Sequence, residues 1–523
     1  MGVSFTAAMP PFGAAYVAVA SVWFVCLATS QQAGIALGDV GILAAGSAQL
    51  LQPAAALAGL GSAGGAGAGA AGREPRNASQ EDALGRAQAH TVRGEQLANK
   101  DQPSYSPREA LAEFSAALEL APGYLPALTG AASAASMAGQ LGAAERFWAR
   151  AAGAAKGLAV LDGETPPAVG ILSALAVVQL LSGKWVDAIE SYQDLLTIRL
   201  TSVEAWVGIG ICFRESGRPD EALVGFQRAI SRDQDGAAAA FEELLPSVNA
   251  GKLWVQRTRD GAGKPIPEAE WLGLAGKADE FRQLGKLEEA AIAYRRLLGM
   301  ASDAGEAAQS DAWNQLGLTL LALLAMGEQP IMAGTSSAKM LAGGKNAFAN
   351  AVARRPFHAD SWVNYAQAVK NTFSGGDQEL QTVLSVLRTA LLLVPQHPRA
   401  LYIGATMLEL AGEVDRSAKL YQQLLLPTVA TENGFQRQVP KDPPAEPKLL
   451  ADGWVSFGLL LGKQTAAADS FTKSLKCFQN AIELEPRASS RAYHHLGQAY
   501  QSVGMLDLAV GSYALALQVS HGL

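Results

Sequence analysis

The first 72 residues contain no lysine or arginine, and Asp39 is their single charged residue. Basic residues orient secretory signals and membrane-spanning helices, and mitochondrial transit peptides are rich in arginine, so a transit peptide is disfavoured. Residues 12–30 are uncharged and reach the minimal length of a spanning helix, so they could form a membrane anchor or a secretory signal. The alternative is a disordered leader, which the Ala/Gly-rich residues 61–72 resemble.

Cysteine is also scarce: Cys26, Cys212 and Cys477 are the only three in 523 residues. They are too few and too scattered for a disulfide framework or a zinc cluster, and they fit a reducing compartment. The net charge of −7 gives no reason to expect nucleic acid as a partner. We therefore expect a cytoplasmic protein, with membrane association through residues 12–30 or entry into the secretory pathway left open.

Catalytic motifs are missing as well. No Ser/His/Asp or Cys/His constellation stands out, and Gly59–Gly64, which satisfies GxGxxG, has no strand before it. The adjacent Glu288 and Glu289 lie where a helix is expected to begin, and there they favour the helix dipole and face solvent. The sequence predicts no enzyme, no catalytic residue, no metal site and no cofactor.

What the chain does contain is a repeated spacing of about 34 residues. Trp206 and Gly210 are followed by a glycine turn and then by Ala222 and Phe226. Large residues at i, i+3 and i+7 predict an amphipathic helix on each side of the turn. The same spacing returns at Trp313, Gly317, Trp362, Trp454, Gly458, Phe478, Leu496, Gly497, Tyr500, Ala509 and Tyr513.

This pattern resembles the tetratricopeptide repeat. The resemblance implies pairs of antiparallel helices in which small residues allow close approach and aromatic side chains fill the flanking holes. One pair cannot bury its own apolar face, so neighbouring pairs stack. We expect an all-α fold, a right-handed α-solenoid of about ten helix-turn-helix repeats after a low-complexity apolar leader.

The spacing also predicts the domain organisation. Residues 1–89 form the leader, residues 90–236 a first array of four repeats, and residues 271–523 a second array of six. Residues 237–270 span one period but fail the pattern, so they are expected to be a junction. Trp313 and Phe348 are 35 positions apart, whereas Trp206 and Phe226 are 20 apart, which predicts an insertion at 327–343. The proline-rich stretch at 432–450 predicts a second insertion, an exposed loop.

The resemblance further implies that the first helix of each pair lines a concave surface and that its variable positions contact ligands. Asparagine and glutamine can hydrogen-bond to the backbone of an extended peptide. His494 and His495 point about 100° apart on a helix and cannot share one metal ion; they are either plain surface residues or groove contacts. The candidate partner-binding residues are Asn314, Gln315, Asn364, Gln367, Arg491, His494, His495 and Gln498.

The function that the resemblance implies is a non-catalytic scaffold or adaptor. It would bind other proteins or extended peptides in its concave groove, as a subunit of a multiprotein complex. The alternative is a membrane-tethered adaptor or a cargo or import receptor that uses residues 12–30 as its anchor. The repeats at 203–236, 310–358 and 359–397 offer no lysines at the positions of a chaperone-tail clamp, so a co-chaperone role is not expected.

Overall fold

The computed structural model describes most of the chain from Ala78 onward. The described residues are 78–99, 102, 104–155, 167–258, 265–300, 302–326, 337–373, 375–425, 428–431, 434–437, 446–463, 468–486 and 489–521. The chain divides into two compact units, Met1–Lys264 and Pro265–Leu523.

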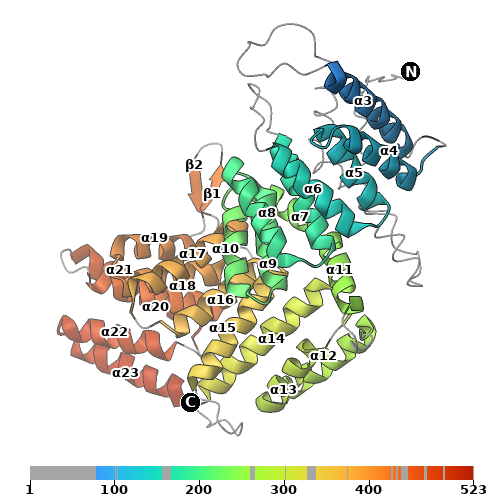
Figure 1. Cartoon of the computed structure of the whole chain (residues 1–523). Coiled ribbons are helices and arrows are strands. Elements are labelled where there is room, and N and C mark those ends of the chain that lie inside the picture. The colour runs from blue at the N-terminus through green and yellow to red at the C-terminus, as the bar shows by residue number, and fades with distance from the viewer. Residues whose placement is uncertain are drawn as a thin grey trace, which may run out of the picture. The chain divides into compact units, whose positions relative to one another are not determined.

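The described part of the first unit contains four helix pairs and one further helix (Figure 1). Each helix packs against the next along the chain. The pairs are α3 (Ala78–Ala98) with α4 (Pro107–Leu120), α5 (Leu125–Met137) with α6 (Leu141–Ala155), α7 (Pro167–Leu181) with α8 (Trp185–Ile198), and α9 (Val203–Glu215) with α10 (Pro219–Ile230); α11 (Gln234–Thr258) follows.

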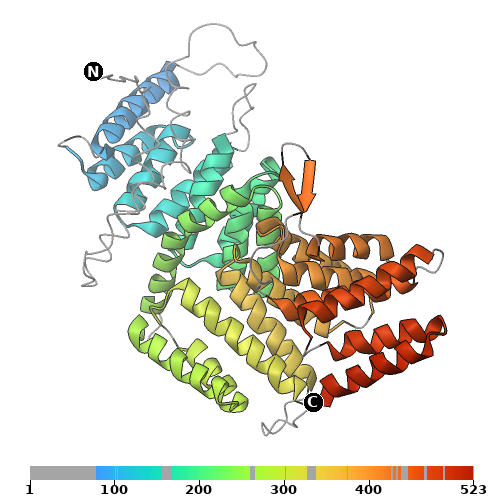
Figure 2. The ribbon, with the colours of Figure 1, turned by 180° about the vertical axis from the view of Figure 1, so that it is seen from behind.

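The described part of the second unit contains six helix pairs, which again pack in chain order (Figure 2). They are α12 (Glu268–Gln283) with α13 (Leu287–Leu298), α14 (Glu306–Ala325) with α15 (Ser337–Arg354), α16 (Ala359–Asn371) with α17 (Asp377–Leu393), α18 (Pro398–Leu410) with α19 (Val414–Leu425), α20 (Pro447–Lys463) with α21 (Ala468–Leu484), and α22 (Ser490–Ser502) with α23 (Leu506–His521). The expected all-α solenoid of about ten helix pairs is confirmed.

Local sequence explains where these helices begin. The side chains of Ser106 and Ser202 accept hydrogen bonds from backbone N–H groups of α4 and α9, which would otherwise lack partners. Pro107, Pro219 and Pro398 occupy the first turn of their helices, where a missing N–H costs nothing. These signals mark the starts of α4, α9, α10 and α18.

The turns within pairs fall into two classes. In six pairs a three-residue turn joins the helices, and its middle residue is a glycine with φ between 67° and 78°. Only glycine adopts this left-handed conformation without steric cost. The glycines are Gly139, Gly183, Gly217, Gly285, Gly412 and Gly504. The other four pairs have longer connections, of eleven residues between α14 and α15 and of eight, five and four residues elsewhere.

Aromatic rings packed on glycines hold the pairs together. A Cβ atom added to Gly210 would lie 2.8 Å from the ring of Phe226, and one on Gly317 would lie 2.7 Å from the ring of Phe348. The same contact joins Gly458 to Phe478 and Gly497 to Tyr513, each at 2.8 Å. Any side chain at these glycines would collide with a ring, so the repeat requires a small residue there.

The remaining residues that define the repeat differ in burial. Ala222, Phe226, Trp362, Phe478, Leu496 and Ala509 are buried, whereas Trp206, Trp313, Trp454, Tyr500 and Tyr513 are partly exposed. Gly225 of α10 also lies close to α9, since a Cβ atom added to it would be 2.9 Å from the backbone nitrogen of Gly210.

The two expected insertions take different forms. Part of the first is helix, because α15 already begins at Ser337 and buries Met340 and Gly344. Part of the second is a strand, β2 (Gly434–Arg437), which pairs antiparallel with β1 (Thr428–Thr431) immediately before the expected insertion. Within the described residues, the first helix begins at Ala78, twelve residues before the expected start of the array at residue 90. The assignment of residues 90–236 and 271–523 as two arrays stays a prediction.

The hypotheses on residues 1–72 lie outside the described residues, as does Cys26. Within the described part of the chain, no helix is both long and apolar enough to cross a membrane.

Candidate functional site

The chemistry-bearing side chains of the described segments do not form a metal or thiol site. No group of three or more His, Cys, Asp or Glu side chains gathers there in a way that could hold a metal ion. Cys212 and Cys477 are buried, and burial raises the pKa of the Cys477 thiol to about 12 and raises that of Cys212 further. Both cysteines therefore act as small core residues.

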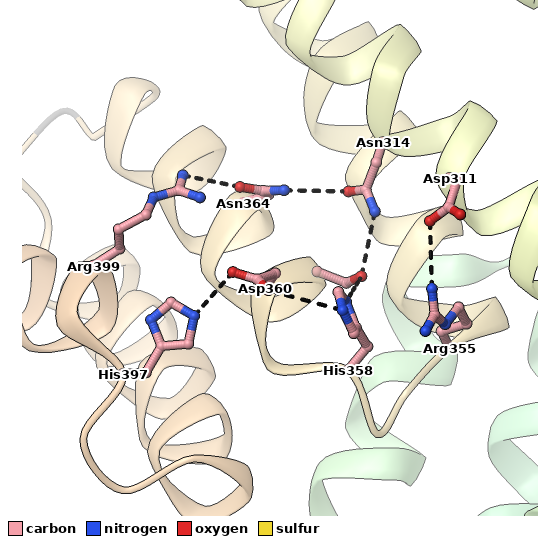
Figure 3. A network of polar contacts seen from close by, with 9 residues as sticks. Asp311, Asn314, Arg355, His358, Asp360, Asn364, His397 and Arg399 are labelled. Carbon is pink, nitrogen blue, oxygen red and sulfur yellow. Dashed lines mark hydrogen bonds and ion pairs between the residues drawn. The ribbon is translucent and has the colours of Figure 1, made fainter. Parts of the chain in front are cut away.

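Polar side chains instead meet across three successive first helices of the second unit (Figure 3). The Nη2 atom of Arg399 on α18 donates to Oδ1 of Asn364 on α16 at 2.9 Å. The Nδ2 atom of Asn364 donates to Oδ1 of Asn314 on α14 at 3.4 Å. The Nδ2 atom of Asn314 then donates to Oγ of Ser361 at 3.3 Å. We call these four residues the polar row.

The polar row keeps spare hydrogen-bonding capacity. A primary amide has two N–H donors and two acceptor lone pairs. Within the row, Asn314 and Asn364 each use one N–H donor and one acceptor lone pair. Each side chain therefore keeps one N–H donor and one acceptor lone pair for a ligand. Their side chains are partly exposed. The row can therefore donate to and accept from the backbone of a chain laid across α14 and α16.

A second set of contacts fixes the turns below the row. The Nδ1 atom of His397 accepts from the backbone N–H of Ala400, so its ring proton is on Nε2 and is donated to Oδ1 of Asp360 at 3.0 Å. His358 lies on the other side of the Asp360 carboxylate, with Nε2 3.8 Å from Oδ2. Its Nδ1 atom is 3.2 Å from Oγ of Ser361. These contacts hold the starts of α16 and α18 in register.

Repeat position explains which residues belong to this site. Asp311, Asp360 and Arg399 each lie two residues before the large residue that opens the packed face of α14, α16 and α18. Asp311 pairs with Arg355 at 3.4 Å. Arg399, Asp360, His358 and His397 were not among the residues predicted from the sequence. Superposing the units by their large residues would have brought Arg399 and Asp360 to one position.

Two predicted residues lie on the same helices but outside the row. The Oε1 atom of Gln315 is buried and has no hydrogen-bond partner among the described residues. Gln367 donates to Oδ1 of Asn371, one turn along α16, at 2.9 Å. The structure thus joins Asn314 and Asn364, and it does not bring Gln315 or Gln367 to them.

The predicted residues of α22 are separate from the polar row. The rings of His494 and His495 lie edge to face with centroids 5.4 Å apart. His495 stacks on Phe478 at 6.0 Å and contacts Gln498 through Nδ1 at 2.9 Å. Burial is the main cause that lowers the pKa of His495. His495 is therefore part of the packing between α21 and α22, whereas Arg491, His494 and Gln498 are exposed.

Comparison with known proteins gives one sequence match. Residues 174–239 match the family described as tetratricopeptide repeat. This stretch contains most of α7, all of α8, α9 and α10, and the start of α11. No curated protein matches the chain.

Solved structures provide the other similarities. TTC0263, a thermophilic TPR protein in Thermus thermophilus, is 16% identical over 47% of this chain and 99% of its own, with a TM-score of 0.29. MamA 41-end from Desulfovibrio magneticus RS-1 is 12% identical over 41% of this chain and 96% of its own, with a TM-score of 0.29. The APC/C hetero-tetramer Cut9-Hcn1 gives 10% identity over 85% of this chain and 95% of the matched chain, with a TM-score of 0.35.

Proposed function

Because the chain carries tetratricopeptide repeats, we propose that it is a non-catalytic scaffold whose second unit binds an extended segment of a partner protein along α14, α16 and α18. The observation that carries the proposal is the polar row, in which amide and guanidinium groups of three successive first helices are linked. An extended segment has an unpaired N–H and C=O at every residue, and the spare amide groups match them.

Preorganisation supports this choice of surface. The hydrogen bonds within the row fix the side chains of Asn314, Asn364 and Arg399 before a ligand arrives, so less conformational entropy is lost on binding. Arg399 spends one of its five N–H donors on Asn364 and can offer the others to a carboxylate. The preferred ligand is therefore an extended segment with an acidic residue near α18.

The test is recovery of partners by a doubly substituted chain. In quantitative affinity purification with mass spectrometry, tagged full-length chain carrying Asn364→Ala and Arg399→Ala should recover at least about tenfold less partner protein than the unsubstituted chain. The reason is that truncating central interface residues commonly costs more than 1 kcal/mol of binding free energy each.

The matched control is Asn350→Ala. Asn350 lies on α15 and hydrogen-bonds Asn346 at 2.7 Å, away from the polar row. It should leave recovery unchanged. Equal recovery by the double variant and the control would contradict the proposed binding surface.

A further inference from the structure

Helix α11 is the one helix of the described residues that belongs to no pair, and its neighbours are unusual. It packs against α9 and α7, the first helices of two successive pairs, as well as against α10 (Figure 1). Among the described helices of the second unit, the first helices of neighbouring pairs contact each other less extensively than α11 contacts α9 and α7. Helix α11 thus packs across the first helices of two successive pairs, α7 and α9.

The buried residues of α11 form one continuous stripe. Ala237, Ala240, Phe241, Leu244 and Val248 are all at most 6% exposed. Spacings of three and four place them on one face over about three turns of helix. The opposite face carries exposed residues such as Glu242 and Asn249. The contact is that of an amphipathic helix on an apolar surface.

Specific contacts fix the register of α11 at both ends. Near its start, the ring of Phe241 lies edge-on to Phe226 at 5.8 Å and under the guanidinium of Arg214 at 5.7 Å. Further along, Lys252 pairs with Glu215, the last residue of α9, at 3.1 Å. The contact therefore combines an aromatic anchor with an ion pair, which a bound helix would need for a unique register.

Gly251 shows how closely the helix fits. A Cβ atom added to it would lie 2.0 Å from the carbonyl oxygen of Leu180 and 2.8 Å from the ring of Trp185. Those atoms belong to the end of α7 and the start of α8. Only a glycine allows the two backbones to meet there.

Other features weaken the fit. Pro246 lies inside α11 and removes one of its backbone hydrogen bonds. The Oε1 atom of Glu243 is buried and has no hydrogen-bond partner among the described residues. A helix that serves only to complete the fold has no reason to keep either feature, whereas a helix that must also leave does.

We infer that the face of α7 and α9 is a binding surface for an amphipathic helix, and that α11 occupies it within the chain until a partner helix displaces it. The partner helix carries the same features: an apolar stripe with an aromatic residue, a small residue where Gly251 lies, and a basic residue that pairs with Glu215. This inference concerns the first unit and does not depend on the function proposed for the second.

The test displaces α11 from the surface of α7 and α9 by a substitution and adds the sequence of α11 back as a separate peptide. In the full-length chain, Gly251→Leu should displace α11, because the new side chain meets the backbone of Leu180. Hydrogen exchange should then speed up at least about tenfold in α11 and stay unchanged in α8 and α10. A fluorescein-labelled peptide of residues 234–258 should bind this variant at least about tenfold tighter than the unsubstituted chain, as measured by anisotropy.

A second variant is needed in case Gly251→Leu disturbs the fold of the first unit beyond the contact between α11 and α7. Lys252→Glu places a carboxylate against Glu215 without added bulk and should give the same results to a smaller degree; Lys252→Arg is its matched control and should behave as the unsubstituted chain. A peptide carrying Gly251→Leu should bind neither chain. Equal peptide affinity for the unsubstituted and substituted chains, or exchange that rises together in α7, α8, α9, α10 and α11, would show that α11 is only a part of the fold.

Discussion

At the scale of single residues, the glycines opposed by rings are the most constrained positions. They were predictable because each follows an aromatic residue by four positions. The structure shows why glycine is needed, since the ring of a second aromatic residue, on the other helix of the pair, lies where a Cβ would be. Arg399 was not predictable in this way, because a polar residue outside the periodic pattern gives no such signal and its role depends on Asn364, 35 positions earlier. Contacts between repeats are invisible until the helices are placed side by side.

Gly317→Ala tests the packing role of these glycines. The new methyl group meets the fully buried ring of Phe348, and overpacking of this kind costs about 1–3 kcal/mol, offset by up to about 1 kcal/mol from better helix propensity. We expect calorimetry to show a lower melting temperature and a free energy of unfolding that is lower by about 1–2 kcal/mol.

Gly273→Ala on α12 is the matched control. Nothing lies within 4 Å of its added Cβ, so only the propensity gain remains and stability should rise by about 0.5–1 kcal/mol. If Gly317→Ala were as stable as Gly273→Ala, close ring packing would not be what keeps glycine at position 317.

At the scale of elements, the pairs were predictable and α11 was not. The glycines in the turns and the spacing of large residues predict each helix pair. Residues 237–270 lack both, so the sequence predicted only a junction there, without a 25-residue helix. A usable signal lay elsewhere: α7 has no charged residue, and twelve of its fifteen residues are buried. A helix that is apolar all round must be covered on every side, which calls for a further neighbour such as α11.

The contact between α11 and α9 should depend on pH through Glu243. Burial, and secondly the charge of Glu204 on α9, raise the pKa of this carboxyl to about 7. The basic groups nearby, Arg214 and Lys252, both contact Glu215 instead. The pKa is higher docked than undocked, so docking is strongest below pH 4.5 and weakens as pH rises through 7. Allowing for the partial exposure of Glu243, we expect about a tenfold change.

Hydrogen exchange at pH 6 and pH 8, corrected for the intrinsic exchange rate, measures this effect. Protection of α11 should fall at pH 8 in the unsubstituted chain and stay constant in Glu243→Gln. The control is Glu242→Gln, a substitution of the exposed residue next to Glu243, in which the protection of α11 should still depend on pH. If the protection of α11 still depended on pH in Glu243→Gln, a group other than Glu243 would be responsible for the effect.

At the scale of the whole molecule, each unit contains one buried cysteine of the described residues. Cys212 lies in α9 of the first unit and Cys477 in α21 of the second. A buried thiol reacts only when its surroundings open, so each cysteine reports opening of its own unit. Because repeat stability is a sum over neighbours, we expect the units to open independently.

Thiol labelling of a Cys26→Ser chain tests this independence. Gly458→Ala places a methyl group 3.1 Å from Cβ of Cys477 and 2.8 Å from the ring of Phe478, so Cys477 should react about tenfold faster while Cys212 is unchanged. Gly210→Ala, which meets Phe226 in the first unit, should have the reverse effect. Acceleration of both cysteines by either substitution would mean that the molecule opens as one cooperative body.

The two classes of turn bear on where the chain tolerates foreign sequence. A three-residue turn with glycine at its centre leaves no room for an added residue, because both helices must leave it in fixed register to reach their ring contacts. The connections of eleven residues between α14 and α15 and of eight between α3 and α4 carry no such requirement. An engineer who wished to place an epitope or a fluorescent protein inside this chain should therefore begin between Met326 and Ser337, and should leave Gly217 and Gly412 untouched.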